Sequence, residues 1–249
     1  DAYGQEIIAT TQTAGVDTQY VQVSDSHSTS VYLAVINANG EMEAAVSDMR
    51  ITELINKEWL QKHEKILKQA SCIIVDTNLS QDVLAHITSC YADKLYLDTV
   101  STTKAKKVKD LIGQFHTIKP NRKEAEILSG LQIDNKESAL NAVSHFITKG
   151  AKNVFISLGR QGIVYGNSEE TGALRVDSPK NILNTTGAGD AFLATLVHGF
   201  LNNRSIAQSA KEAYAASLII LQSEDTSNNT ITIRQIESLA KELNYEQIP

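Results

Sequence analysis

The strongest constraint on the fold is a regular alternation of short apolar runs with longer helical patterns. Apolar runs occupy residues 72–76, 94–98, 115–119 and 154–158, and a helical pattern or turn residues follow each of them. Such alternation is typical of parallel strands joined by crossover helices, so the sequence predicts an α/β fold. We expect helices near residues 56–69, 81–91, 122–129, 136–149, 188–203, 205–222 and 231–244.

The region before these runs has a different pattern. From Thr29 to Glu43 apolar and polar residues alternate, and Asn39-Gly40 has the composition of a tight turn. This pattern predicts a β-hairpin or a pair of solvent-facing strands. A hairpin of this kind is typical of a lid over the α/β core rather than of the core itself.

Length and charge limit the classes of function. The 249 residues, 42% of them hydrophobic, suit one α/β domain as readily as two smaller ones, and we expect one. A net charge of -6 opposes binding to a phosphate backbone, so we expect no nucleic-acid partner. The lysines within residues 104–109 are interpreted mostly as the solvated face of a helix.

Cysteine and histidine usage adds little chemistry. Cys72 and Cys90 form no CxxC pair, which indicates neither a disulfide framework nor a zinc site and fits a reducing cytoplasm. The six histidines lack metal-ligand spacing. No apolar run approaches the roughly 20 residues of a membrane span. We therefore predict a cytoplasmic protein with no membrane partner.

Polar residues follow the apolar runs at the place where an open parallel sheet collects its ligands, beyond the carboxyl ends of the strands. These positions are the first candidates for a site. They are Asp76, Asn78, Asp98, Asn121, Glu124, Ser157 and Gly159.

The most informative segment is residues 184–190, NTTGAGD, which directly precedes an apolar helical pattern. Gly187 and Gly189 let the backbone approach a ligand closely, and the unpaired N–H groups of a first helical turn suit a phosphate. Within such an anion site, Asp190 is a candidate acceptor for the proton of an attacking hydroxyl. A helix-capping role explains Asp190 equally well, and the segment alone leaves both open.

Two common nucleotide motifs do not occur. No GxxxxGK[ST] sequence is present, and GAGDAF lacks the third glycine of a dinucleotide fingerprint and does not follow an apolar strand. A nucleotide site in this chain has to be of another kind.

Residues 184–196, NTTGAGDAFLATL, resemble the signature of the ribokinase-like (PfkB) family of carbohydrate kinases. Three further segments are similar to family motifs in the same order: Asp1 to Gly4 (D-x-x-G), residues 119–124 (KPNRKE) and residues 157–162 (SLGRQG). The resemblance covers essentially the whole chain. It is closest to a nucleoside kinase of the family at residues 48–52, 75–80, 97–101, 116–130 and 227–229.

The resemblance implies a ribokinase-like three-layer sandwich, with a central mostly parallel sheet, flanking helices and a small β lid at about residues 20–45. We expect a single kinase domain over residues 1–249 whose N-terminal part, with a Gly-Gly turn and substrate-binding residues, is missing before Asp1. The implied activity is ATP-dependent phosphorylation of a nucleoside 5′-hydroxyl. The alternatives are a kinase for another pentose or nucleoside, and a catalytically inactive nucleotide- or sugar-binding module.

Site residues are carried over by position. Asp190 is the implied base, and the backbone of Gly187, Ala188 and Gly189 is implied to stabilise charge on the transferring phosphoryl group. Contacts to ATP are implied for Asn121, Ser157, Gly159, Gly162, Thr186, Lys104 and Asn228.

Two cation sites are implied as well. Glu124 and Asn121, on one side of a first helical turn, would hold Mg²⁺ largely through water. Asn184 and Thr186 resemble a site for a monovalent cation, potassium, although many relatives have Asp where this chain has Asn184. From the residues alone, Glu124 is an ordinary first-turn helix acid.

On the substrate side, Ser30, Tyr32 and Asn78 are the implied partners of Asp190. Their neutral hydrogen-bonding groups suit sugar hydroxyls and the edge of a uracil base. Ordinary hairpin packing explains Tyr32 equally well. The alternating strand at residues 30–36 suits a homodimer through the lid strands and also a monomer with an exposed sheet.

Overall fold

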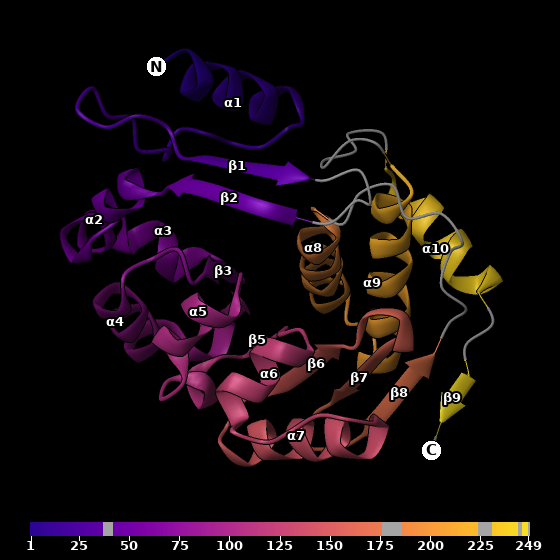
Figure 1. Cartoon of the computed structure of the whole chain (residues 1–249). Helices are drawn as coiled ribbons and strands as arrows, with labels where there is room; N and C mark the ends of the chain where they lie inside the picture. The colour runs from indigo at the N-terminus through magenta and orange to yellow at the C-terminus, as the bar shows by residue number, and fades with distance from the viewer. Residues whose placement is uncertain (37–41, 176–185, 224–230, 244–245, 249) are drawn as a thin grey trace.

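The computed structural model describes residues 1–36, 42–175, 186–223, 231–243 and 246–248. Within these ranges the chain forms a seven-stranded sheet and a separate two-stranded sheet. Helices cover both faces of the larger sheet (Figure 1).

The large sheet has the order β3-β4-β5-β6-β7-β8-β9. Neighbouring strands from β3 to β6 are parallel, whereas the pairs β6–β7, β7–β8 and β8–β9 are antiparallel. Strands β3 to β6 and β8 therefore point the same way, and β7 and β9 run against them. The strands are β3 (Ile73–Asp76), β4 (Leu95–Asp98), β5 (Thr117–Ile118), β6 (Asn153–Ser157), β7 (Ile163–Gly166), β8 (Thr171–Arg175) and β9 (Glu246–Ile248).

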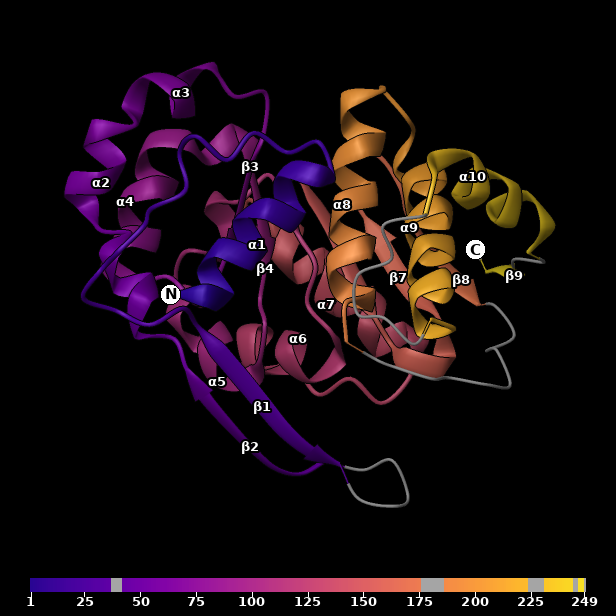
Figure 2. The ribbon, with the colours of Figure 1, turned by 90° about the horizontal axis from the view of Figure 1, so that it is seen from above.

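Alternation along the strands builds two cores. Leu95 and Leu97 of β4 pack with one set of helices, while Tyr96 between them packs with the other. The first set includes α4 (Gln81–Tyr91), α6 (Arg122–Ser129) and α7 (Lys136–Thr148). The second contains α8 (Ala188–Leu201) and α9 (Ile206–Leu221), with α10 (Ile233–Glu242) packed on α9. The predicted three-layer sandwich is confirmed, and Figure 2 shows α8, α9 and α10 side by side.

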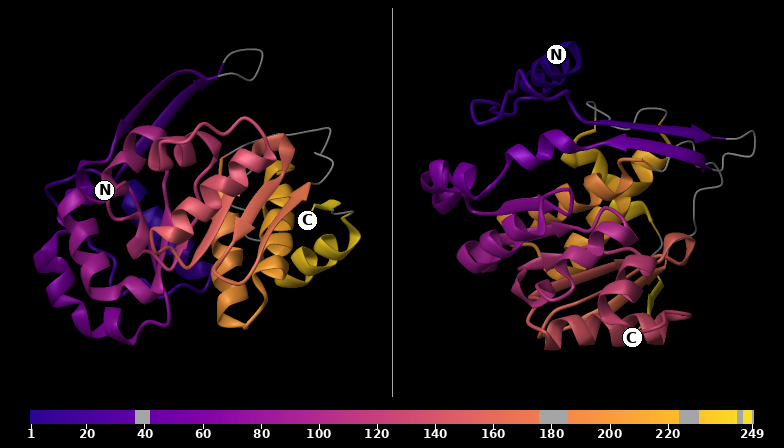
Figure 3. Two further views of the ribbon diagram at one scale, coloured as in Figure 1. Left: turned by 90° about the horizontal axis from the view of Figure 1, so that it is seen from below. Right: turned by 60° about the vertical axis from the view of Figure 1, so that its left-hand side comes forward.

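The predicted hairpin is present as β1 (Val31–Ile36) and β2 (Met42–Asp48), which pair antiparallel. It lies outside the layered body (Figure 3), and the side chains of Leu33 and Val46 are 63% and 71% exposed. The predicted lid boundaries were about 20–45. The first strand starts later than this because residues 20–30 form no strand, and the second strand continues to Asp48.

Two features of the N-terminal third differ from the predicted helices. Helix α1 (Ala2–Thr13) was not predicted, and none of its side chains is buried, so it carries no core stripe that a pattern could detect. The helix predicted over 56–69 is divided at His63 into α2 (Lys57–Lys62) and α3 (Glu64–Gln69).

The remaining helical segments are short: α5 (Thr102–Ala105) and the 3₁₀ turns Arg50–Leu54, Ala92–Lys94, Lys106–Val108, Ile112–Gln114 and Gly159–Gln161. None of the described helices has the length and apolar character that crossing a bilayer requires.

Candidate active site

The first turn of α8 is the centre of the site. Gly187 is the N-cap residue, with a φ of 85°, and no side chain caps the helix. Asp190 therefore does not serve as the N-cap; it is the acidic residue of the first turn. The unpaired amides of this turn and the positive end of the helix dipole are therefore within one helical turn of Asp190.

An ion pair lies directly beneath this turn. Lys119 Nζ is 3.3 Å from Asp98 Oδ2, and both side chains are largely buried, at 11% and 17% exposure. A Cβ added to Gly189 would lie only 3.2 Å from Lys119 Nζ and 3.9 Å from Asp98 Oδ2. Glycine at 189 thus lets the start of α8 pack against the last residue of β4 and the first residue after β5.

The Asp190 carboxyl is electrostatically perturbed. Partial burial raises its pKa above the ordinary value, and the negative charges of Asp98 and Asp76 raise it further, while Lys119 opposes them. A carboxylate whose proton affinity is raised by its surroundings is a better proton acceptor than an ordinary surface Asp. This is the property that a base acting on a hydroxyl needs.

A cavity of about 270 Å³ adjoins the turn. It brings together Ser157, Gly159 and Gly162 with Ala188 and Gly189, which are far apart in the sequence. Polar and apolar side chains both line the cavity, as is typical of small-molecule sites. Its further lining residues are Lys119, Arg160, Ile163, Phe192, Tyr214, Ser217, Leu218 and Leu221.

The two glycines of the β6–β7 turn have different roles. A Cβ on Gly162 would lie 1.9 Å from the Leu174 carbonyl oxygen, so this glycine is required by packing of the turn on β8. A Cβ on Gly159 would meet no atom within 4 Å. Both have positive φ values, 61° and 90° for Gly159 and Gly162 respectively. Gly159 therefore leaves backbone exposed where a ligand can approach it.

Asn121 and Glu124 form a capping box at the start of α6. Glu124 is buried, and its Oε2 accepts hydrogen bonds from Thr99 Oγ1 at 2.6 Å and from Asn121 N at 2.9 Å. The Asn121 backbone also bridges to Ser157, which ties α6 to the cavity. The structure shows the capping role directly, and a role toward Mg²⁺ stays a prediction.

Asn78 and Lys104 meet next to Asp76. Asn78 Nδ2 donates to Asp76 Oδ2 at 2.6 Å, and Lys104 Nζ donates to Asn78 Oδ1. Lys104 is thus on the side of Asp76, not in the lining of the 270 Å³ cavity. The predicted substrate contact Asn78 and the predicted phosphate contact Lys104 form one polar group.

The remaining predicted residues lie in other parts of the chain. Ser30 directly precedes β1, and Tyr32 is its second residue, on the two-stranded sheet. Thr186 directly precedes the Gly187 cap, so it is beside the first turn of α8. Asn184 and Asn228 lie outside the described residues. Among the described residues no group of three His, Cys, Asp or Glu side chains is arranged to hold a metal ion.

The sequence predicts no role for Lys119 and makes Asp98 only a candidate site position, yet both belong to the centre. A signal for them exists in the sequence, since each is the last residue of an apolar run, at the strand end where ligands collect. Tyr214 and Phe192 of the cavity wall gave no such signal, because apolar helix positions are read as core.

The fold, this cavity with its buried lysine and helix start, and the Asp190 carboxylate on the same helical turn are those of an ATP-dependent sugar or nucleoside kinase. The chain belongs to the pfkB family of carbohydrate kinases, whose family model matches residues 1–233.

Known proteins match nearly the whole chain. This chain is 33% identical to the pseudouridine kinase of Escherichia coli, over 97% of this chain and 77% of that protein. The crystal structure of a putative sugar kinase from Clostridium perfringens is 32% identical, with a TM-score of 0.88. The match covers 100% of this chain and 78% of that chain. A structure from E. coli solved with ATP and Mg²⁺ shares the fold, with a TM-score of 0.79 at 16% identity, over 97% of this chain and 80% of its own.

Proposed function

We propose that the protein transfers the terminal phosphoryl group of ATP to the 5′-hydroxyl of pseudouridine, giving pseudouridine 5′-phosphate and ADP. The observation that carries the proposal is the position of Asp190 on the first turn of α8, above the Lys119–Asp98 pair and beside the cavity that holds Ser157 and Gly159.

Each residue of the centre has a step to perform. Asp190 accepts the proton of the attacking hydroxyl, which makes that oxygen a nucleophile. The amides of Gly187, Ala188 and Gly189 and the ammonium of Lys119 stabilise negative charge in the transition state. Asp98 holds Lys119 under the turn and neutralises it while the site is empty of phosphate.

The cavity fits a nucleotide. The open backbone at Gly159 allows a flat ring or ribose to lie against it, and Phe192, Tyr214 and Leu218 supply an apolar surface for a base. Asn121, whose backbone bridges to Ser157, and Glu124 would orient water around Mg²⁺. Bound Mg²⁺ would neutralise phosphate charge, and the relative solved with ATP and Mg²⁺ supports both cofactors.

The choice of acceptor rests on the E. coli relative named for pseudouridine. Asn78, held by Asp76 and Lys104, and the lid residues Ser30 and Tyr32 are the proposed contacts to sugar and base. All are neutral, so they suit a nucleoside without phosphate.

A panel of acceptors tests the proposal. Purified protein, including any residues its gene encodes before Asp1, should form ADP with pseudouridine at a kcat/KM at least about tenfold above that with uridine, inosine or ribose. Preference for free ribose would overturn the acceptor while leaving the kinase in place. Binding of ATP and pseudouridine by calorimetry without any ADP formed would favour the inactive module instead.

Two further expectations are tested separately. A monovalent cation at Asn184 and Thr186 predicts faster turnover in KCl than in tetramethylammonium chloride. A homodimer through β1 and β2 is supported by the exposed apolar side chains Leu33, Val35 and Val46. Leu33→Glu should then halve the mass seen by light scattering, and an unchanged monomer mass in both proteins would exclude that interface.

A further inference from the structure

Thr99, the first residue after β4, is polar and fully buried. Side chains alternate between the faces of a sheet, so Leu97 packs in the core that contains α6, whereas Asp98 pairs with Lys119 under the start of α8. Thr99 continues this alternation on the side of α6, where its hydroxyl donates to Glu124. The end of one strand therefore supplies polar contacts at the starts of two helices.

The Thr99 hydroxyl holds one oxygen of the Glu124 carboxylate. Thr99 Oγ1 donates to Glu124 Oε2 at 2.6 Å, and Asn121 N donates to the same oxygen at 2.9 Å. Two donors on one oxygen fix the position and the rotation of the carboxylate. The other oxygen, Oε1, accepts no hydrogen bond from the described residues and is not one of their buried side-chain atoms left without a partner, so it reaches accessible surface.

The backbone that carries this hydroxyl is itself fixed. The Thr99 carbonyl accepts hydrogen bonds from Thr77 Oγ1 at 2.8 Å and from Ser101 N at 2.6 Å. The bond from Ser101 closes a three-residue turn centred on Val100, whose φ of 57° is strained for a β-branched residue. Strained backbone persists where surrounding contacts over-determine it, and it clusters at functional sites. Thr99 is therefore held rigidly against Glu124.

The Glu124 carboxylate fits a role toward hydrated Mg²⁺. In phosphoryl-transfer sites this ion keeps several waters and is held by one or two carboxylates together with substrate phosphates. Because both donors of Glu124 bind Oε2, Oε1 is the oxygen that can face water around the ion. Hydrogen bonds that orient such a carboxylate from behind typically contribute about 10- to 100-fold to metal affinity.

We propose that Thr99 is a positioning residue for Mg²⁺: its hydroxyl anchors Oε2 of Glu124 so that Oε1 is directed at the water shell of the ion. This inference rests on the proposed function, because it takes Glu124 to serve the metal. The capping box of α6 does not require Thr99, since Asn121 and Glu124 complete it by themselves. If Thr99 served only to satisfy a buried carboxylate, metal affinity would not depend on its hydroxyl.

Binding of Mn²⁺ in place of Mg²⁺, followed by electron paramagnetic resonance, tests the inference without turnover. With the protein saturated by a non-hydrolysable ATP analogue, Thr99→Val should raise the Kd for Mn²⁺ at least about tenfold. Thr99→Ser keeps the hydroxyl and should stay within about threefold of wild type. Thr88→Val is the matched control, because Thr88 is also buried and its hydroxyl donates to Ala85 O within α4. Thr99→Ala removes the same hydroxyl and replaces Thr99→Val if that variant does not fold.

A double-mutant cycle separates positioning from general damage to the site. Glu124→Gln should weaken Mn²⁺ binding at least as much as Thr99→Val, and Thr99→Val added to it should change the Kd by no more than about threefold. A loss that persists in the Glu124→Gln background would overturn the positioning role. An unchanged Kd in Thr99→Val beside a weakened Glu124→Gln would overturn it as well, while leaving Glu124 at the metal. An unchanged Kd in Glu124→Gln would contradict the proposed metal role of Glu124 itself, and Thr99 would lose its role with it.

Discussion

The ionised Asp190 carboxylate lowers the stability of the folded protein. Its pKa is raised in the folded state by burial and by Asp98, so ionisation is less favourable there than in the unfolded chain. The folded state therefore holds its proton more tightly, and stability falls as the pH rises from the unfolded value near 4 through the raised pKa. At neutral pH the full penalty is present.

We predict that Asp190→Asn raises the Tm near pH 7 and that this gain disappears below about pH 4, where both states of the wild-type carboxyl are protonated. Thermal unfolding of both proteins between pH 4 and 8 measures it. Asp82, exposed in the first turn of α4, is the matched control, and Asp82→Asn should leave the Tm unchanged or lower it. A lower Tm for Asp190→Asn at pH 7 would contradict the assigned electrostatics.

Lys119 is expected to act on both the phosphate and Asp190. Lys119→Met removes the cation that lowers the pKa of Asp190, so the acid limb of the kcat/KM profile should move to higher pH. Turnover at the optimum should fall by about 10² to 10³. Lys123→Met, exposed on α6, is the control. An unshifted acid limb would remove Lys119 from the neighbourhood of the base.

At the scale of elements, the β6–β7 turn combines a glycine required by packing with one whose backbone faces open space. Gly162→Ala places a methyl group against the Leu174 carbonyl at positive φ, and it should destabilise the protein by about 3 kcal/mol or more. Gly159→Ala has open space, so only the backbone term of about 1 to 2 kcal/mol applies. Urea unfolding compares them. Equal losses would contradict the distinction, whereas a raised KM for ATP in Gly159→Ala alone would support it.

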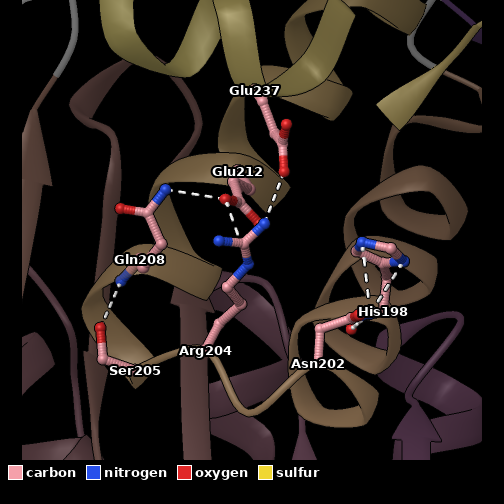
Figure 4. A network of polar contacts seen from close by, with 7 residues as sticks. All are labelled: His198, Asn202, Arg204, Ser205, Gln208, Glu212 and Glu237. Carbon is pink, nitrogen blue, oxygen red and sulfur yellow. Dashed lines mark hydrogen bonds and ion pairs between the residues drawn. The ribbon is translucent and has the colours of Figure 1, made fainter. Parts of the chain in front are cut away.

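Arg204, between α8 and α9, forms ion pairs with Glu212 of α9 and Glu237 of α10 (Figure 4). Glu212 is 1% exposed, so Arg204→Met leaves a buried carboxylate without its cation and should destabilise by about 3 kcal/mol. Glu237→Ala removes only the half-buried partner and should cost about 1 kcal/mol or less. The double variant Arg204→Met/Glu212→Met should recover most of the loss, and failure to recover would show that Glu212 is not the cause.

On the scale of the whole molecule, the sequence predicted what periodicity encodes. Strands β3 to β6, the helices between them and the GAGD turn follow from short apolar runs and small residues at a helix start. The antiparallel β7 to β9 were not predicted, because the β6–β7 turn was read as a ligand loop and Thr171–Arg175 lacks a long apolar run. Helix α1 was not predicted, because it has no stripe of buried apolar residues.

At the site, the sequence mainly failed to predict contacts between segments that are distant along the chain. The Lys119–Asp98 pair depends on β4 and β5 being neighbours in the sheet, and nothing in either segment states the order of strands. The same holds for Asn78 and Lys104, where a surface-like lysine proves to bind a strand-end amide. Sequence patterns locate strand ends, whereas the sheet topology decides which ends meet.

The central claim is that Asp190 is the base of the phosphoryl transfer, and single-turnover kinetics with ATP and pseudouridine tests it most directly. Asp190→Asn should slow the chemical step by about 10³-fold or more while the Kd for ATP stays within about threefold of wild type. A chemical step retained within about tenfold, with the Asn confirmed by mass spectrometry, would contradict the account.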